Sequence, residues 1–192
     1  MRLCTSCIKD FEPVLYSKHM MTPQRDTFKI NVFYAYTNSI KSIIYKFKFS
    51  KELKLFKTIA SLILEVVDLK NTPDLIVPIP SHPIDEIKRG YSHMSIVANY
   101  LSKLTGIKNI NIIKRKIFPL LRRNQKFKDR QQRLNRAKRF SMRINPQNIK
   151  SKRILLIDDV MTTGATASEC AQLLLNNGAK SVEVICLALT RL

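Results

Sequence analysis

The stretch RILLIDDVMTTGAT, residues 153–166, constrains the fold more than any other part of the sequence. Its four consecutive apolar residues predict a strand that is buried on both faces, as in a parallel sheet. Asp158 and Asp159 stand at the end of this strand, and the TTGAT turn after them opens a predicted helix from about Ala165 to Asn177. Open α/β sheets bind their ligands at the carboxyl ends of their strands. We therefore expect a ligand site at this turn.

Other apolar runs alternate with helical patterns along the chain. Short strands are predicted at 28–36, 75–80, 110–115 and 181–189. Apolar residues recur at helical spacing in 51–70, and a second helix at 91–106 is expected to end at Gly106. This alternation favours an α/β fold with a mostly parallel sheet flanked by helices. Residues 1–27 lack such periodicity, so we expect a short N-terminal appendage there and one main domain at 28–192.

The chain is strongly basic, with 34 Lys and Arg residues against 14 Asp and Glu residues and a net charge of +20. From Lys114 to Arg153, sixteen basic residues accompany a single acid, Asp129. Such a field favours polyanions: nucleic acid, an anionic membrane surface or multiply charged phosphates. A ribosome-associated protein, or a lysine excess without functional meaning, would have a similar composition.

The hydropathy and the cysteines indicate the compartment. No apolar stretch reaches the length of a membrane-spanning helix, and the N-terminus lacks a secretory signal pattern. We expect a cytoplasmic protein, with peripheral association at the inner face of the cytoplasmic membrane left open. Cys170 and Cys186 lie in apolar surroundings typical of core residues, whereas Cys4 and Cys7 form a CxxC pair. Structural disulfides are not expected.

The turn at 162–166 combines several groups that bind an anion. Backbone N–H groups, the positive end of a helix and three threonine hydroxyls converge there, which is typical of a monophosphate site. Gly164 lets the backbone approach the anion because it has no Cβ atom. Asp158 and Asp159 would repel the phosphate but suit the hydroxyl groups of an attached sugar. The turn therefore predicts a sugar-phosphate ligand.

Four other interpretations of this stretch are weaker. An apolar strand that ends in acids also occurs in Walker B motifs, but the chain has no GxxxxGK[ST] loop. A GxGxxG dinucleotide loop is absent as well. The phospho-acceptor pocket of a response regulator uses paired acids but does not require the TTGAT turn. A purely structural strand, turn and helix with threonine caps would not need the whole pattern.

The segment ILLIDDVMTTGAT (154–166) resembles the phosphoribosyl pyrophosphate (PRPP) signature of type I phosphoribosyltransferases. Other segments resemble the ComF family of competence proteins, ComFC-like members in particular. They are FYAYTNSIKSIIYKFKF (33–49), VPIPSHP (77–83), KRGYSHMSIVANYLSK (88–103), the basic segment, and GAKSVEVICLALTR (178–191). The resemblance spans roughly residues 28–191. It implies the type I phosphoribosyltransferase fold.

The resemblance also implies a role for each part of the site. Asp158 and Asp159 would hold the ribose hydroxyls of PRPP, and Mg²⁺ would bridge ribose and pyrophosphate oxygens. The 5′-phosphate would be cradled by Thr162, Thr163, Gly164, Ala165 and Thr166. The pyrophosphate would be met by Ser81, His82, Lys88 and Arg89. A flap that also serves DNA binding would carry Arg122, Arg123, Gln125, Lys126, Arg130 and Arg133.

The reaction that this implies is displacement of pyrophosphate at the anomeric carbon of ribose. Its oxocarbenium-like transition state would be stabilised by Mg²⁺ and by cations around the leaving group. Asp159 is the candidate base for deprotonating an acceptor, with His82 or His93 as alternatives. The sequence does not identify an acceptor, and whether transfer takes place stays open.

The biological role implied by the family is the uptake and internalisation of single-stranded DNA in natural transformation, together with other components of the DNA-uptake machinery. The net charge of +20 favours DNA phosphates independently of the resemblance. Phe127 and Phe140, which lie among cations, could stack on bases. Two alternatives stay open. One is a nucleotide-salvage phosphoribosyltransferase that acts on a small acceptor, and the other is a regulator that senses PRPP and binds nucleic acid without catalysis.

Members of the family commonly carry an N-terminal zinc module with two CxxC pairs. Here only Cys4 and Cys7 match that module, and His19 is a candidate third ligand. A tetrahedral structural site needs four ligands. The predicted zinc site is therefore incomplete within one chain, which leaves a degenerate module or zinc shared between two chains.

Overall fold

The computed structural model describes residues 11–21, 27–50, 52–67, 72–116 and 139–190. The strands are β1 (Pro13–Met21), β2 (Thr27–Ala35), β3 (Leu75–Pro78), β4 (Lys108–Asn109), β5 (Ile113–Arg115), β6 (Phe140–Met142), β7 (Arg153–Met161) and β8 (Ser181–Leu189). The helices are α2 (Asn38–Phe49), α3 (Leu55–Leu64), α4 (Pro83–Arg89), α5 (His93–Thr105) and α7 (Ala165–Leu175), with a 3₁₀ turn η2 at Pro146–Ile149.

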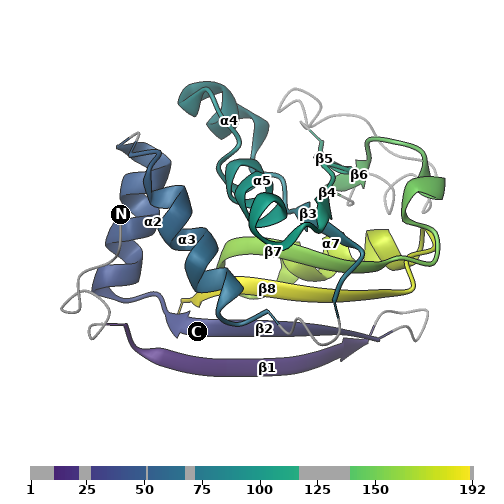
Figure 1. Ribbon diagram of the computed structural model, residues 1–192, viewed down its shortest axis with the longest axis horizontal. Helices are drawn as coiled ribbons and strands as arrows, with labels where there is room; N and C mark the ends of the chain where they lie inside the picture. Colours follow the sequence, from purple (N-terminus) through teal and green to yellow (C-terminus); the bar gives the residue numbers. More distant parts are fainter. Residues whose placement is uncertain (1–10, 22–26, 51, 68–71, 117–138, 191–192) are drawn as a thin grey trace, which may run out of the picture.

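Six strands form one sheet in the order β1-β2-β8-β7-β3-β4 (Figure 1). The pairs from β2 through β8, β7 and β3 to β4 are all parallel, and β1 runs antiparallel to β2. A separate antiparallel ribbon consists of β5 and β6. The mostly parallel sheet flanked by helices, which the alternation of apolar runs predicts, is thereby confirmed.

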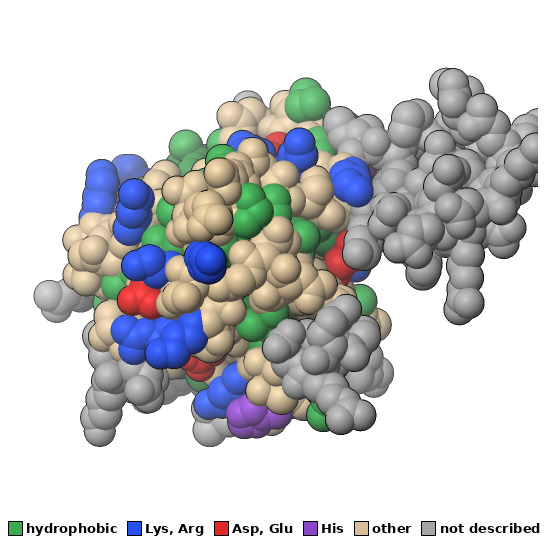
Figure 2. Space-filling model, turned by 90° about the vertical axis from the view of Figure 1, so that its right-hand side faces the viewer, with side chains coloured by type: hydrophobic (Ala, Val, Ile, Leu, Met, Phe, Trp, Pro, Cys, Tyr) green, Lys and Arg blue, Asp and Glu red, His purple; other side chains and the backbone are tan. Residues whose placement is uncertain are grey.

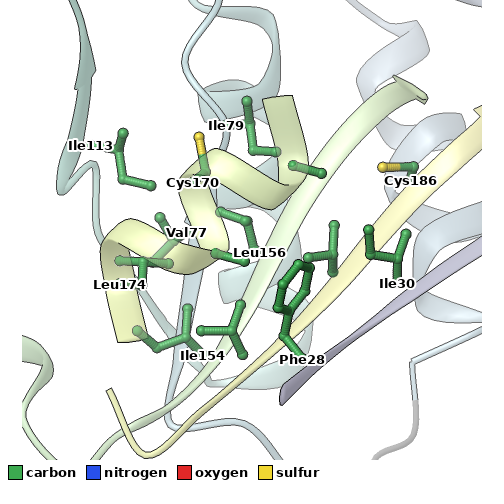
Figure 3. Packing of buried hydrophobic residues seen from close by; sticks show 14 of the residues in the cluster. Phe28, Ile30, Val77, Ile79, Ile113, Ile154, Leu156, Cys170, Leu174 and Cys186 are labelled. Carbon is green, nitrogen blue, oxygen red and sulfur yellow. The ribbon is translucent and has the colours of Figure 1, made fainter. Parts of the chain in front are cut away.

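Helices cover both faces of the sheet, and each face has its own apolar core. Ile154 and Leu156 of β7 pack with Cys170 of α7 on one face (Figure 3). Leu155 and Ile157 pack on the other face, with residues of α2, α3 and α5. Successive side chains of a strand point to opposite faces. The continuous apolar run in β7 is therefore the consequence of burial on both sides.

Several elements differ from the expected ones. The sequence places the two aspartates at the end of a strand, but β7 continues through them to Met161 and pairs with β8 as far as Leu189. The aspartates therefore lie inside the strand and continue its alternation between the two faces. The helix expected over 51–70 is shorter, at Leu55–Leu64, and no sequence pattern indicated α4.

The N-terminal segment is described only from residue 11 onward, with a gap at 22–26. Its strand β1 pairs with β2 and forms one edge of the main sheet. Cys4 and Cys7, the predicted zinc ligands, lie outside the described residues. None of the helices in the described ranges combines the length and the apolar character that crossing a bilayer requires.

Candidate functional site

A cavity of about 260 Å³ lies where β3 and β7 give way to the loops that follow them. Its polar lining consists of Lys48, Ser81, His82, Asp85, Arg89, His93, Arg115, Asp158, Asp159, Thr162 and Thr166. These residues come from α2, from the loop after β3, from α4, α5 and β5, and from β7 with its turn. Segments far apart in the sequence therefore meet at the carboxyl end of the parallel sheet, as expected for an open α/β fold.

The turn after β7 has the geometry that an anion requires. Gly164 is the N-cap of α7 and has a φ of 77°, a left-handed conformation that favours glycine. The first turn of α7 carries no acidic residue, so the positive end of the helix is not neutralised by its own side chains. Thr162 and Thr163 are exposed at the turn. A smaller cavity of about 50 Å³ lies beside it, between Asp158, Gly164 and Cys186.

Asp159 is the most heavily engaged side chain of the site. Its Oδ2 lies 2.6 Å from Lys48 Nζ and 2.7 Å from His93 Nε2. Only 5% of the Asp159 side chain is exposed. Burial by itself would raise the pKa of this carboxyl, but the Lys48 ammonium and the His93 hydrogen bond outweigh it and hold the pKa below its usual range. Asp159 is therefore ionised at neutral pH.

His93 links this carboxylate to the loop after β3. Its Nε2 contacts Asp159 and its Nδ1 lies 3.0 Å from Ser81 Oγ. When Nε2 donates its proton to the carboxylate, Nδ1 of the neutral ring accepts a hydrogen bond from the serine hydroxyl. His93 is the first residue of α5 and is buried, with the Phe47 ring against its edge. The site thus contains a continuous chain from Ser81 to Asp159.

Asp158 has a different environment from its neighbour. It is partly exposed, lines both cavities, and accepts a hydrogen bond from the backbone N–H of Asp159 (2.9 Å). Desolvation, followed by the negative charge of Asp159, raises the pKa of Asp158. The two adjacent aspartates are therefore chemically unlike: one is a tightly paired carboxylate, and the other is a carboxyl group whose pKa is raised.

Two arginines bring positive charge to the cavity. The Nε and Nη2 atoms of Arg89 are buried without a hydrogen-bond partner among the described residues. Such donors are costly to leave unpaired, and an anion in the cavity would satisfy them. The guanidinium of Arg115 lies 5.6 Å from the centre of the Phe140 ring. Arg139 lies over the same ring and pairs with Glu169 of α7 at 2.8 Å, which fixes the β5–β6 ribbon against α7.

The structure brings most of the expected site residues together. Ser81, His82, Arg89, Asp158, Asp159, Thr162 and Thr166 all line the main cavity, and Gly164 lines the smaller one. Thr163 and Ala165 are exposed at the turn without lining either cavity, and Lys88 is exposed on α4 outside the cavity lining. The expected flap residues Arg122, Arg123, Gln125, Lys126, Arg130 and Arg133 lie outside the described residues, as does Phe127.

Phe140 does not play the part that the sequence indicates. Only 2% of it is exposed, and both arginines lie over its ring, so no face is free for a nucleobase. Lys48 and Arg115 are cavity residues that the sequence does not reveal. Lys48 is one of three lysines on α2, and it is partly buried whereas Lys41 and Lys46 are exposed.

The expected Mg²⁺ can be compared with the donors that the chain offers. Mg²⁺ in phosphate sites binds through one or two carboxylates and the phosphates of the ligand. Here one oxygen of Asp159 already accepts from both Lys48 and His93. In the part of the chain that the structure describes, no three His, Cys, Asp or Glu side chains are grouped to hold a metal ion. The Oδ2 atom of Asp159 therefore does not suit a Mg²⁺ ligand, and a Mg²⁺ that bridges ribose and pyrophosphate oxygens stays a prediction.

Comparison with known proteins identifies related chains. The phosphoribosyl transferase domain family matches residues 49–191. The chain is 33% identical over 156 residues to competence protein F of Haemophilus influenzae, covering 78% of this chain and 67% of that protein. It is 28% identical over 162 residues to DNA utilization protein YhgH of Escherichia coli (81% and 69% covered). It is 29% identical over 163 residues to competence protein ComFC of Streptococcus pneumoniae (80% and 65% covered).

Proposed function

Because the chain belongs to the phosphoribosyl transferase domain family, as a ComF-type member with the type I phosphoribosyltransferase fold, we propose that its cavity binds PRPP. The observation that carries this proposal is the meeting of the TTGAT turn, the aspartates and Arg89 around one cavity. The turn suits a monophosphate, and the unpaired N–H groups of Arg89 suit a second anionic group on the same ligand. PRPP carries both groups on one ribose.

Each part of the ligand has a counterpart in the cavity. The 5′-phosphate is held at the amino end of α7 by backbone N–H groups and by threonine hydroxyls. Asp158 lies next to this turn and holds a ribose hydroxyl. The pyrophosphate lies toward Arg89 and Arg115, beside the loop that carries Ser81. The ligand would thus extend across the cavity, with its 5′-phosphate at the TTGAT turn and its pyrophosphate near the loop after β3.

PRPP is expected to bind the full chain with one ligand per chain, and ribose 5-phosphate is expected to bind at least about tenfold more weakly. The reason is that ribose 5-phosphate lacks the pyrophosphate that would satisfy the buried donors of Arg89. Isothermal titration calorimetry measures both affinities. An absence of PRPP binding at millimolar concentration would remove the basis of the proposal.

Phosphoribosyl transfer is a second candidate function, favoured by the chain of hydrogen bonds from Ser81 through His93 to Asp159. A carboxylate whose pKa is held low is a poor proton acceptor, so His93 is better suited to take a proton while Asp159 orients it. Steady pyrophosphate release with a defined acceptor would establish this activity.

We also propose that the protein acts on single-stranded DNA in natural transformation. Two of its relatives are named competence proteins and a third a DNA utilization protein. Figure 2 shows Lys and Arg side chains spread over the right-hand side of Figure 1, so basic character is not confined to the cavity. A net charge of +20 attracts a polyanion by release of its counterions.

Helix α2 offers a surface suited to single-stranded DNA. The rings of Tyr45 and Phe49 lie 5.1 Å apart and are 56% and 61% exposed. Lys41 and Lys46 are exposed on the same helix. Aromatic rings stack on bases while lysines meet the phosphates, without dependence on sequence. Among the described residues, this surface is the alternative to the basic residues of 122–133 as the DNA-binding surface.

Replacing both Lys41 and Lys46 by Ala is expected to flatten the salt dependence of single-strand binding, because each lost phosphate contact lowers the slope by about 0.7. Replacing Tyr45 and Phe49 by Ala is expected to weaken binding at every salt concentration without changing the slope. Fluorescence anisotropy of a labelled oligonucleotide at several KCl concentrations measures both effects.

The control replaces two exposed lysines elsewhere, Lys103 and Lys180. If the α2 variants bind the oligonucleotide with the same affinity and salt dependence as this control, the basic residues of 122–133 are the better candidates for the DNA-binding surface.

A further inference from the structure

The cavity contains a cation of its own at the aspartate pair. Lys48 lies in the last turn of α2, and its Nζ contacts Asp159 Oδ2 at 2.6 Å. Of the Lys48 side chain, 20% is exposed, so most of this side chain is withdrawn from solvent. The family match begins at residue 49, which means that this lysine comes from just outside the matched segment.

The ammonium group competes with a divalent cation for the same oxygen. A divalent cation would need a lone pair of Asp159, and Oδ2 already receives both Lys48 and the Nε2 of His93. A metal ion at this oxygen would lie within a few ångströms of the ammonium, where like charges repel strongly at low dielectric. The pair Lys48–Asp159 is neutral overall, and its ammonium group occupies the position at Oδ2 that a metal ion would otherwise take.

The remaining cations lie where the charge of a diphosphate would fall. Arg89 presents buried Nε and Nη2 atoms without a partner among the described residues, and Arg115 lines the same cavity. Guanidinium groups bind phosphate oxygens through paired, charge-assisted hydrogen bonds. Arg89 and Arg115 are thus the cavity side chains suited to the anionic groups of a ligand.

We propose that this cavity binds its sugar diphosphate in metal-free form, with Lys48 occupying at Asp159 Oδ2 the place that a divalent cation would otherwise take. This inference rests on the proposed function, since it concerns how PRPP is held. It replaces the expectation of a bridging Mg²⁺. It also assigns a role in the site to helix α2, which the sequence analysis names only as part of the segment 33–49 that resembles the ComF family.

The test is calorimetric titration of the full chain with PRPP, either in EDTA or in excess MgCl₂ at the same ionic strength. The affinity of the unaltered protein in EDTA is expected to stay within about threefold of its affinity in MgCl₂. The variant Lys48→Met is expected to lose on the order of tenfold or more in EDTA. MgCl₂ should restore part of this loss, because an unpaired Asp159 oxygen can then take the metal ion. Lys48→Arg keeps the charge and should resemble the unaltered protein.

Lys103→Met is the matched control, because it removes one exposed lysine by the same substitution outside the cavity. Binding of PRPP by the unaltered protein in MgCl₂ but not in EDTA would overturn the inference and leave the proposed function standing. An absence of binding under both conditions would instead contradict the proposed function. Circular dichroism monitors the fold of each variant. Should Lys48→Met fail to fold, the comparison of EDTA with MgCl₂ on the unaltered protein still decides the question.

Discussion

Replacing Asp159 by Asn is expected to destabilise the protein by about 3–5 kcal/mol, the typical cost of breaking a buried ion pair from one side. The substitution leaves Lys48 and His93 beside a neutral amide, although both contact Asp159 within 2.7 Å in the unaltered protein. The folded-state pKa of Asp159 is lowered, so its contribution to stability is present above about pH 4, the unfolded value, and is lost as the pH falls further.

Asp158→Asn is expected to have the opposite effect. The pKa of Asp158 is raised by desolvation and by the charge of Asp159, so the folded state binds this proton more tightly than the unfolded state does. Stability therefore decreases as the pH rises above about 4, until the raised pKa is passed. An Asn side chain does not titrate, so the variant does not lose stability in this way as the pH rises. The variant should gain stability relative to the unaltered protein as the pH is raised from 5 to 9.

Urea unfolding at pH 5, 7 and 9 measures both effects as changes in the free energy of unfolding. Asp85→Asn is the control, because this cavity residue is exposed and is expected to change stability by no more than about 1 kcal/mol. Equal stabilities for Asp158→Asn and Asp159→Asn at all three pH values would contradict the unlike environments of the pair.

Gly164→Val is expected to reduce PRPP affinity on the order of a hundredfold or more. A non-glycine residue at a φ of 77° costs about 1–2 kcal/mol in the backbone. A Cβ atom there would also lie 3.4 Å from the Met161 sulfur, so the branched side chain pushes the turn out of position. The backbone N–H groups that hold the phosphate move with the turn. Titration calorimetry with PRPP measures the loss.

Gly106→Ala provides the comparison for backbone strain alone. Gly106 has a φ of 73° and ends α5, but a Cβ atom added there would meet nothing within 4 Å. This variant should lose stability by a similar backbone cost and keep its PRPP affinity. If Gly164→Val binds PRPP as tightly as Gly106→Ala does, the turn does not hold the phosphate.

The parts of the fold that the sequence predicts are those with a local pattern. The bounds of β8 agree with the expected strand at 181–189, and Gly106 ends α5 as its conformational freedom indicates. The strand, turn and helix at 153–175 depend on apolar runs and on one glycine, all within a short segment. Local spacing is sufficient for such elements because their hydrogen bonds and periodicity are local.

The parts that the sequence does not predict depend on distant contacts. Nothing near Lys48 in the sequence indicates that it meets Asp159, which lies far along the chain. The two aspartates differ in environment because β7 extends to Met161. Pairing with β8 keeps them in the strand, although the sequence predicts a turn after them. Arg115 enters the cavity because Phe140, from another segment, lies beneath its guanidinium. Each of these features depends on contacts between distant segments, and no local pattern of residues in the sequence predicts such contacts.

The position of β8 in the sheet has a consequence for how the chain is assembled on the ribosome. β8 is the last described strand, yet it lies between β2 and β7 and pairs with both. The pair of β1 and β2, which is synthesised before the other described strands, therefore has no further neighbour in the sheet until β8 emerges. Such long-range pairing delays folding and leaves strand edges open in the meantime. Until β8 pairs with it, the free edge of β2 is therefore open to pairing with other chains.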